Sequence, residues 1–344
     1  MPRMVRKPKT TLKQVAEAAG VSQSTASRAL SGSQAIAADT VARVAATAKA
    51  LNYATKRKPA IDRQEGRKGV VGMVVAALQN AFYPYLVDRI HDELDALGYD
   101  IVLIIDELSN SSSSRKVQGL IDTALDGVLF TTASIHSPAV DLLVEREIPT
   151  VLAIRSNKRG NVTVVESDNR MAGLDAARHL LDLGHREVGF IQGPRNTSTA
   201  VDRFDGFRSY YERQGLVLSA EEVIWGEYNH EAGYSGFMKL TQGQRPPTAI
   251  FCGNDVIALG ALDAAHKVGI GVPDEVSIIG VDDIPMASWS MISLTTIRQS
   301  IEQIGVRAAR RLVDHIESGS LTPISNDILP TSLVRRSTTA PARA

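Results

Sequence analysis

The sequence has little cysteine, no long hydrophobic run and no net charge. One cysteine, Cys252, occurs in 344 residues, which excludes an intrachain disulfide framework. Its neighbours Ile250 and Phe251 are apolar, so a buried structural thiol is favoured over a reactive one. No apolar run approaches the roughly 18 residues of a membrane helix, and the basic residues 1–11 precede no apolar core typical of a signal peptide. We therefore expect a soluble, cytoplasmic protein.

The motifs of common enzyme classes are also missing. The chain contains no Gly-x-x-x-x-Gly-Lys-Ser/Thr loop for phosphates, no Gly-x-Gly-x-x-Gly for dinucleotides and no Gly-x-Ser-x-Gly nucleophile turn. Its seven histidines show no metal-ligand spacing. We expect no catalytic function, no metal and no cofactor.

The zero net charge hides an uneven distribution. Lys and Arg number 38, as do Asp and Glu, but residues 1–68 contain 14 basic and four acidic residues, an excess of ten. The remaining residues therefore carry ten net negative charges. Such an asymmetry indicates a basic module for a polyanion attached to an acidic globular body, and about two domains are expected at this length.

From residue 69 onward, short apolar runs alternate with amphipathic segments. Strands are expected at residues 70–76, 101–105, 127–131, 150–153, 187–191, 249–252 and 276–281. Helices are expected around residues 84–97, 115–125, 171–183, 201–214 and 256–268. Gly98, Gly184 and Gly269 follow helix ends and are candidate C-caps.

This alternation predicts an α/β fold with parallel sheets covered on both faces. There are too many strand–helix units for one compact sheet, so we expect two. Residues 110–114 read as a solvated loop, and residues 337–344 as a disordered tail.

Residues 11–53 show helical periodicity. Gly20 permits a tight turn between two helices, and Ser22 is placed to cap the second. That second helix is expected to bury Ala26 and Leu30 and to expose polar residues, namely Gln23, Ser24, Ser27 and Arg28. Short hydroxyls with one amide and one guanidinium are suited to reading a DNA major groove. An ordinary helical hairpin with a solvated face is the alternative.

Six segments in order resemble the lactose-repressor (LacI/GalR) family of bacterial transcriptional regulators. The first is its DNA-binding head, TLKQVAEAAGVS at 11–22 with STASRAL at 24–30 and LNY at 51–53. The others are LGHREVGFI at 183–191, RFDGFR at 203–208, GNDVIALG at 253–260, GVDDI at 280–284 and LTTIRQ at 294–299. The resemblance therefore covers essentially the whole chain.

The resemblance implies a helix-turn-helix head at residues 1–53, a basic hinge or linker at 54–68, and an effector-binding and dimerisation domain at 69–344. The last would be a periplasmic-binding-protein-like body of two subdomains, residues 69–166 with 296–325 and residues 167–295 with 326–336. Base readers would be Gln23, Ser24 and Arg28, and phosphate contacts Thr11, Ser22, Thr25 and Ser27. Lys56 and Arg57 would add basic contacts from the linker. The third helix is expected at about residues 39–51, with Asp39 as its cap.

The linker departs from the family pattern. In the family a hinge helix enters the minor groove and wedges a leucine between base steps. Here the wedge position is Asp62, and Pro59 disfavours a helix through Lys58. A flexible basic tether and a functional hinge helix remain equal alternatives.

An effector cleft is expected where the parallel strands end. Strand ends place Asn80, Phe82, Tyr83, Thr131, Ser134, Asp255 and Asp282 there. The resemblance adds Asp168, Arg203, Trp289 and Gln299. Asn254 and Asp255 have an alternative role as helix caps.

One position limits the effector. Sugar-responsive members have an aspartate where this chain has Ile154, followed by Arg155. A polyhydroxylated ligand would lose a hydrogen-bond partner there, at a cost of about 1–3 kcal/mol. A nucleoside, a sugar derivative or a small organic acid is therefore favoured over a plain hexose.

These observations predict a sequence-specific DNA-binding regulator, in the family's usual outcome a repressor. A homodimer would bind a near-palindromic double-stranded operator, with affinity controlled by a small-molecule effector in the interdomain cleft. The alternative is a solute-binding protein of the same body fold, with no role at DNA. The residues leave open which effector it is and whether that effector releases or promotes DNA binding.

Overall fold

The protein divides into two compact units, Met1–Lys68 and Gly69–Ala344. A computed structural model describes residues 10–30, 36–51, 53, 67–106, 110–122, 125–243, 245–318 and 323–343. The first unit is called the head below and the second the body, and each is described by itself.

The head is built from three helices around a small core. They are α1 (Leu12–Ala18), α2 (Gln23–Leu30) and α3 (Ala38–Ala50). Small apolar side chains fill its centre, so the helices approach closely: Val15, Ala16, Ala19, Ala26, Ala29, Val44 and Ala48. The expected third helix is confirmed, but Asp39 lies within its first turn and is not its cap.

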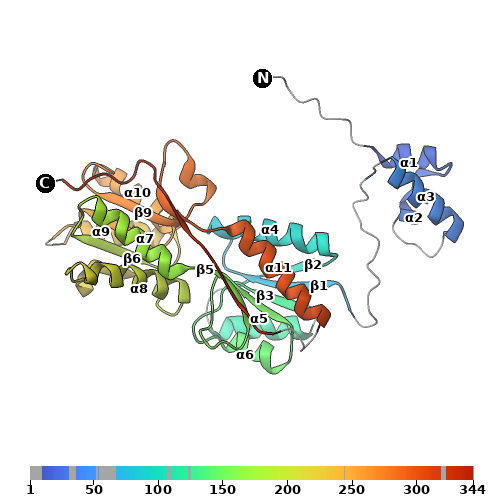
Figure 1. Cartoon of the computed structure of the whole chain (residues 1–344), viewed down its shortest axis with the longest axis horizontal. Coiled ribbons are helices and arrows are strands. Elements are labelled where there is room, and N and C mark those ends of the chain that lie inside the picture. Colours follow the sequence, from blue (N-terminus) through green and yellow to red (C-terminus); the bar gives the residue numbers. More distant parts are fainter. Residues whose placement is uncertain are drawn as a thin grey trace, which may run out of the picture. The chain divides into compact units, whose positions relative to one another are not determined.

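The body contains two six-stranded sheets, and helices cover both faces of each (Figure 1). The first sheet has the order β11-β5-β4-β3-β1-β2 and is entirely parallel. Its strands are β1 (Val70–Val75), β2 (Asp100–Ile105), β3 (Gly127–Phe130), β4 (Thr150–Ala153), β5 (Thr163–Ser167) and β11 (Asn326–Leu329). Its helices are α4 (Phe82–Leu97), α5 (Asn110–Asp122), α6 (Pro138–Glu145) and α11 (Ile301–Ser318).

The second sheet has the order β12-β10-β9-β8-β6-β7, and only β12 runs antiparallel to its neighbour. Its strands are β6 (Val188–Gln192), β7 (Val223–Trp225), β8 (Ala249–Cys252), β9 (Ser277–Asp282), β10 (Thr295–Arg298) and β12 (Ser332–Val334). Its helices are α7 (Asn169–Asp182), α8 (Ser198–Arg213), α9 (His230–Thr241) and α10 (Asp255–Val268). Short 3₁₀ turns at Ala220–Glu222 and Pro285–Ser288 complete this half.

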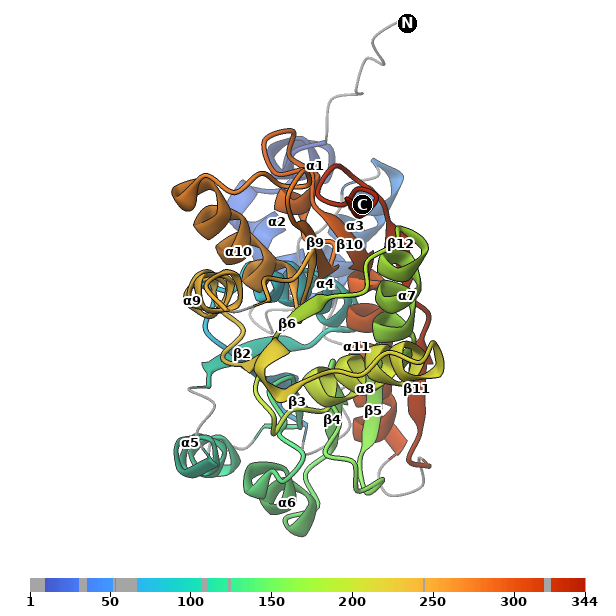
Figure 2. The ribbon, with the colours of Figure 1, turned by 90° about the vertical axis from the view of Figure 1, so that its left-hand side faces the viewer.

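Helices pack in pairs on the two sheets. On the first sheet α4 lies beside α11, and α5 lies beside α6. On the second, α7 lies beside α8, and α9 lies beside α10 (Figures 1 and 2). Glycine ends α4 and α10 as expected, with left-handed φ of 85° at Gly98 and 74° at Gly269. The expected parallel α/β fold with two sheets is confirmed.

The chain changes sheet later than the sequence indicated. We expected residues from 296 onward to join the first subdomain, but β10 pairs with β9 and β12 up to Arg298. We expected residues 326–336 to lie in the second subdomain, but β11 pairs with β5 of the first sheet. Strand pairing through the backbone decides both boundaries. The pattern of apolar residues in the sequence does not show which of the two sheets an edge strand joins.

The predictions of a loop at residues 110–114 and of a disordered tail at residues 337–344 are wrong. α5 begins at Asn110, in the stretch expected to be a loop, and Ser113 ties its first turn down by donating to Asp106 at 2.6 Å. The C-terminal segment is docked and not a free tail. The hydroxyl of Thr338 donates to the Ile278 carbonyl at 2.7 Å, and His185 Nε2 lies 3.0 Å from the Ala340 carbonyl oxygen.

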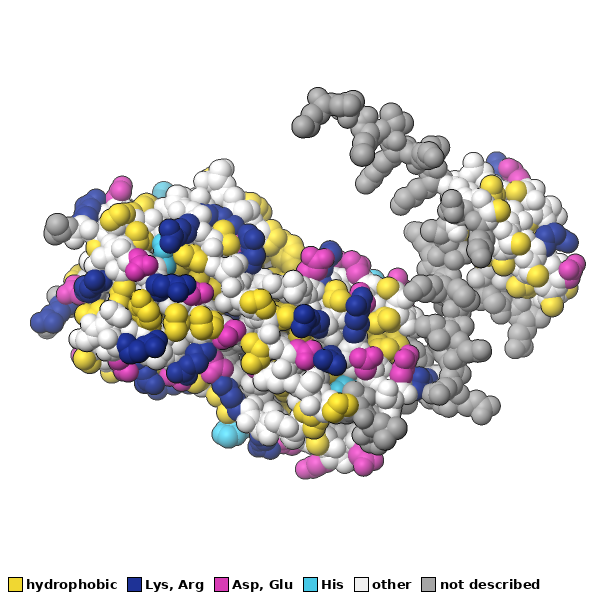
Figure 3. Space-filling view, in the orientation of Figure 1, with side chains coloured by type: hydrophobic (Ala, Val, Ile, Leu, Met, Phe, Trp, Pro, Cys, Tyr) yellow, Lys and Arg dark blue, Asp and Glu magenta, His cyan; other side chains and the backbone are white. Residues whose placement is uncertain are grey.

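The excess negative charge of the body forms no single patch on the face seen in Figure 3. Basic and acidic side chains are interspersed there. Several form ion pairs, such as Arg159 with Asp141 at 2.6 Å and Arg310 with Glu93 at 2.7 Å. Within the described residues, no helix is long and apolar enough to cross a membrane.

Candidate functional site

Hydrogen-bonding side chains begin the first two helices of the head. Thr11 and Gln14 form a capping box at α1, in which the backbone N–H of Gln14 donates to Thr11 Oγ1 at 3.4 Å and the backbone N–H of Thr11 donates to Gln14 Oε1 at 2.8 Å. Gly20 has a left-handed φ of 66°, which most side chains disfavour, and it turns the chain toward α2. Ser22 Oγ then accepts from the backbone amide of Thr25 at 3.1 Å, as the sequence predicted.

This cap presents one polar face of α2 to solvent. Gln23, Ser24 and Arg28 are exposed, whereas Ala26 and Ala29 face the core of the head. Thr25 is half-buried, and its hydroxyl and that of Ser24 each lie 2.8 Å from Ser22 Oγ. Ser27 also lies in α2. The predicted base readers therefore share one accessible surface.

Other predicted features of the DNA-binding part fall outside the described residues. These are Lys56 and Arg57, together with the linker positions Pro59 and Asp62. The choice between a tether and a hinge helix therefore stays a sequence prediction.

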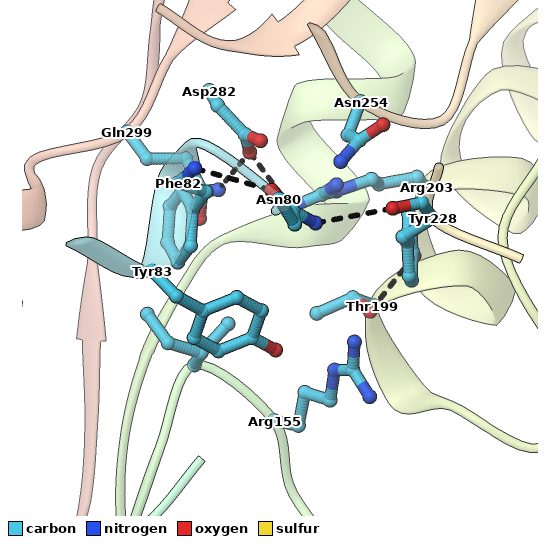
Figure 4. A pocket seen from close by; sticks show the side chains of 11 residues that line it. Asn80, Phe82, Tyr83, Arg155, Thr199, Arg203, Tyr228, Asn254, Asp282 and Gln299 are labelled. Carbon is cyan, nitrogen blue, oxygen red and sulfur yellow. Dashed lines mark hydrogen bonds and ion pairs between the residues drawn. The ribbon is translucent and has the colours of Figure 1, made fainter. Parts of the chain in front are cut away.

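The body contains a cleft at the carboxyl ends of its strands. Its walls lie close together, with a cavity volume of about 20 Å³ between them, and it is lined by Asn80, Phe82, Tyr83, Ile154, Arg155, Thr199, Arg203, Tyr228, Asn254, Asp282 and Gln299 (Figure 4). The first five follow strands of the first sheet, and the others follow strands of the second. Parallel strands point their carboxyl ends to one edge, which brings these distant residues together.

Direct hydrogen bonds join the two walls of this cleft. Asn80 Nδ2 donates to the Tyr228 carbonyl at 3.2 Å, and the Ser156 amide donates to Ser198 Oγ at 2.9 Å. The two subdomains are thus in contact around the cleft, and a shift of one against the other would change its walls.

Arg203 is held inside the second wall by three groups. Its Nε donates to Asn169 Oδ1 at 2.9 Å, its Nη1 donates to the Gly253 carbonyl at 2.6 Å, and its Nη2 lies 3.9 Å from Asp282 Oδ1. Gln299 Nε2 donates to the same Asp282 oxygen at 2.6 Å. Burial raises the pKa of Asp282, and the nearby Arg203 guanidinium opposes that rise.

Close helix packing fixes the position of Arg203. A Cβ atom on Gly173 of α7 would lie 1.9 Å from the Arg203 carbonyl oxygen, and one on Gly206 of α8 would lie 2.0 Å from the Arg170 carbonyl oxygen. Only glycine at both positions allows α7 and α8 to approach this closely. Glycine at position 193 likewise allows the Tyr228 ring to pack against the backbone, because a Cβ there would lie 2.1 Å from that ring.

Five of the nine predicted effector contacts line the cleft: Phe82, Tyr83, Arg203, Asp282 and Gln299. Thr131 does not, because its buried hydroxyl donates to the Val74 carbonyl at 2.8 Å. Asp255 is buried beneath the surface and accepts from Thr296 Oγ1 at 2.5 Å and the Ile284 amide at 3.0 Å. Burial, followed by the neighbouring Asp282, raises the Asp255 pKa.

The remaining two predicted contacts also lie elsewhere. Asp168 caps α7, accepting from the Met171 amide at 2.8 Å, and faces a different hollow near β5 and β11. Trp289 ends the 3₁₀ turn at Pro285–Ser288 and is 56% exposed. Both follow strands or turns in the sequence, but neither lines the cleft.

Sequence reasoning placed Asn80 at the cleft, but it did not select five other residues of the wall as effector contacts: Ile154, Arg155, Thr199, Tyr228 and Asn254. Thr199 and Tyr228 follow β6 and β7, and their side-chain oxygens lie 2.9 Å apart. The rule that ligands lie beyond strand ends would have found Thr199, whereas β7 has only three residues and carries little pattern. Asn254 caps α10, the helix-cap role that the sequence offered, and it also lines the cleft.

Comparison with known proteins agrees with this architecture. A family model described as "Bacterial regulatory proteins, lacI family" matches residues 11–56, and one for a periplasmic binding protein-like domain matches residues 177–339. The HTH-type transcriptional repressor PurR of Photorhabdus laumondii is 30% identical over 329 residues, covering 95% of this chain and 96% of that protein. The chain belongs to the LacI family of bacterial regulatory proteins. It is a DNA-binding transcriptional regulator with an α/β body.

Other members of the LacI family align over the same length. The ribose operon repressor of Escherichia coli K12 is 29% identical over 328 residues, covering 95% of this chain and 99% of that protein. The structure of a transcriptional regulator CelR–cellobiose complex is 28% identical, with a TM-score of 0.74 over 96% of this chain and all of that one. A lac repressor dimer bound to operator and an anti-inducer shares the fold, with a TM-score of 0.72 at 24% identity.

The family match decides between the two alternatives left by the sequence. A solute-binding protein without a DNA role is not favoured, because the head matches the regulatory family and these relatives are named as transcriptional repressors or regulators. Those names describe regulatory proteins and not enzymes.

Proposed function

We propose that the protein is a homodimeric transcriptional repressor whose operator affinity is set by a small molecule bound in the cleft. One observation carries the proposal. The same chain presents a capped helix with an exposed polar face in the head and a polar, aromatic-lined cleft at the strand ends of the body. Neither a solute-binding protein nor a simple DNA-binding module needs both. The protein would act in the cytoplasm and would not be an enzyme.

In the head, α2 would enter the major groove. Gln23 and Arg28 would form paired hydrogen bonds to base edges, and Ser24 would make a third base contact. The hydroxyls of Thr11, Ser22, Thr25 and Ser27 would bind phosphates, as would Lys56 and Arg57 from the linker. The exposure of Gln23, Ser24 and Arg28 supports this arrangement.

In the body, the effector would bind between the aromatic and polar walls of the cleft. Phe82 and Tyr83 would contact a ring, while Arg203, Asp282 and Gln299 would bind polar groups. Asn80 bonds to the opposite wall, so a ligand that alters this contact would shift one subdomain against the other. A coupling of about 1–3 kcal/mol is typical of such regulators.

An exposed apolar surface supports a dimer. Strand β2 lies at the edge of the first sheet, and it exposes Val102, Leu103 and Ile105 to about 40%. Tyr85 on the neighbouring α4 is similarly exposed. An exposed apolar sheet edge favours pairing with another chain, and a two-fold dimer would place two heads on a near-palindromic site.

A gel-shift titration of the full-length protein tests the proposal. The protein should bind a selected operator at least about a hundred-fold more tightly than a random duplex of equal length. Specific DNA-binding proteins usually prefer their own sites by about a thousand-fold or more. A variant lacking residues 1–68 should bind neither. Equal affinity of the full-length protein for both duplexes would refute the regulator proposal.

A further inference from the structure

Arg155 is a buried cation in the cleft that lies against an aromatic ring and has no ion-pair partner among the described residues. It follows β4, is only 4% exposed, and makes no hydrogen bond or ion pair with any residue that the structure describes. Its buried Nε lacks an acceptor, and its guanidinium carbon lies 5.3 Å from the centre of the Tyr228 ring. Figure 4 shows this guanidinium directed toward Thr199 and Tyr228, on the side of the cleft away from Asp282.

The backbone before Arg155 supports this placement. Ile154 has a φ of 75°, a left-handed conformation that is unfavourable for a β-branched residue. Its amide is nevertheless held by a 2.9 Å hydrogen bond to the Val165 carbonyl. The fold therefore maintains a strained turn directly before the side chain that enters the cleft.

The one carboxylate among the described lining residues, Asp282, interacts electrostatically with both Arg155 and Arg203. Among its described lining residues there are two guanidinium groups, Arg155 and Arg203, and one carboxylate, Asp282. That carboxylate already accepts from Gln299 and faces Arg203. The cleft thus carries one positive charge in excess, and an unpaired charge removed from water is unfavourable.

The surroundings of Arg155 suit an anion. A guanidinium presents a planar fork of N–H donors that matches carboxylate and phosphate oxygens. Thr199 lies in the first turn of the 16-residue helix α8, where backbone N–H groups and the helix dipole favour negative charge. The hydroxyls of Thr199 and Tyr228 are hydrogen-bonded to each other at 2.9 Å, so this pair has one hydroxyl proton left to donate beside the guanidinium. Phe82 and Tyr83 supply aromatic surface for an attached ring.

We propose that the cleft takes a small anionic ligand whose carboxylate or phosphate group pairs with Arg155. This inference rests on the proposed function for the identity of the cleft as the effector site. It narrows the effector to a ring-bearing anion and disfavours a neutral sugar or nucleoside. The guanidinium of Arg155 and the remaining hydroxyl proton of the Thr199–Tyr228 pair would hold the anionic group, and the aromatic side chains would hold the ring.

Thermal unfolding of the full-length protein with three probes tests this assignment. Benzoate carries a ring and a carboxylate, phenyl phosphate a ring and a phosphate, and benzyl alcohol a ring without charge. At equal ionic strength, benzoate or phenyl phosphate should raise the Tm of the body by about 2 °C or more, and benzyl alcohol should not. The more stabilising anion identifies the anionic group.

Variants at Arg155 show whether the response belongs to this side chain. Arg155→Gln should abolish it, and Arg155→Lys should retain part of it, because the charge remains but the fork is lost. Arg159→Gln, four residues further on, removes an exposed arginine paired with Asp141 and should leave the response intact. If Arg155→Gln does not fold, the Lys and Arg159 variants still make the comparison.

Three outcomes would overturn the anion site: no response of the wild type to either anion, equal stabilisation by benzyl alcohol, or an unchanged response in the Arg155 variants. Operator titration separates this failure from that of the regulator proposal. If operator binding is intact but no response depends on Arg155, only the anion-site proposal is refuted. If a response depends on Arg155 but the protein shows no operator preference, only the regulator proposal is refuted.

Discussion

The surface of α2 and the cleft of the body place their functional side chains in opposite ways. On α2, Gln23, Ser24 and Arg28 are near neighbours in sequence and exposed to solvent. In the cleft, the wall residues follow seven different strands and are held by one another. A local surface tolerates change without loss of fold, whereas a shared wall does not. Substitutions should therefore separate binding from stability in the head and combine them in the body.

The largest expected effect comes from breaking the wall that α7 and α8 form. Gly173→Ala places a methyl group against the Arg203 carbonyl oxygen, so the helices must separate. The free energy of unfolding of the body should fall by about 3 kcal/mol, measured by urea denaturation. Gly119→Ala is the control, because a Cβ at this helical position meets no atom within 4 Å. Equal effects of the two substitutions would contradict the packing argument.

A pH-dependent effect should be confined to the body. Burial, reinforced by Asp202, raises the pKa of Glu166 to about 7 from 4.5. The folded state thus favours the protonated acid, and stability from this group is lost as pH rises from about 4.5 through 7. As the pH rises from 5 to 8, the free energy of unfolding of Glu166→Gln should therefore increase by about 2 to 3 kcal/mol relative to that of the wild type. Chemical unfolding at both pH values measures the gain.

Exposed Glu145→Gln serves as the control for that experiment and should show no such gain. A pH-independent difference between Glu166→Gln and the wild type would mean that Glu166 is ionised in the folded protein throughout the range.

The head should lose binding without losing its fold. Arg28→Ala should cost about 2 kcal/mol of operator affinity, roughly thirty-fold, and leave the affinity for random duplex mostly intact. Lys13→Ala removes an equal charge from α1 and should weaken both duplexes alike. Gel-shift titration measures both ratios, and equal losses with Arg28→Ala would show that it contacts only phosphates.

The smallest expected effect concerns the cap of α2. Ser22→Ala removes the acceptor for the Thr25 amide and should destabilise the head by about 1 kcal/mol. Amide hydrogen exchange in the full-length chain measures the stability of the head separately from that of the body. Faster exchange in α2 with unchanged exchange in the body is the expected result. Exposed Gln23→Ala should leave exchange unaltered.

Local features of the sequence predicted more than non-local ones. The Ser22 cap, the turn at Gly20 and the C-caps at Gly98 and Gly269 depend on a few neighbouring residues and are confirmed. α11 was missed although its amphipathic pattern was available in the sequence. β7 and β12 have three residues each, too few for a periodic signal.

Within the candidate site, strand-end reasoning and family resemblance found different residues. The first placed Phe82, Tyr83 and Asp282 at the cleft, and the second added Arg203 and Gln299. Both also selected residues that point elsewhere: Thr131 and Asp255 satisfy buried hydrogen bonds, and Asp168 caps α7. Sequence position shows that a residue follows a strand, but not which way its side chain turns.

The sequence by itself determined the division into a basic head and an acidic body, the class of fold and the family. Each depends on composition, periodicity or consecutive motifs, which are properties of neighbouring residues. Only the tertiary structure decided which strand ends share one cleft, where the chain changes sheet and that Arg155 is buried with no ion-pair partner among the described residues. Those features depend on side chains far apart in the chain, and their burial and pairing exist only once both sheets have formed.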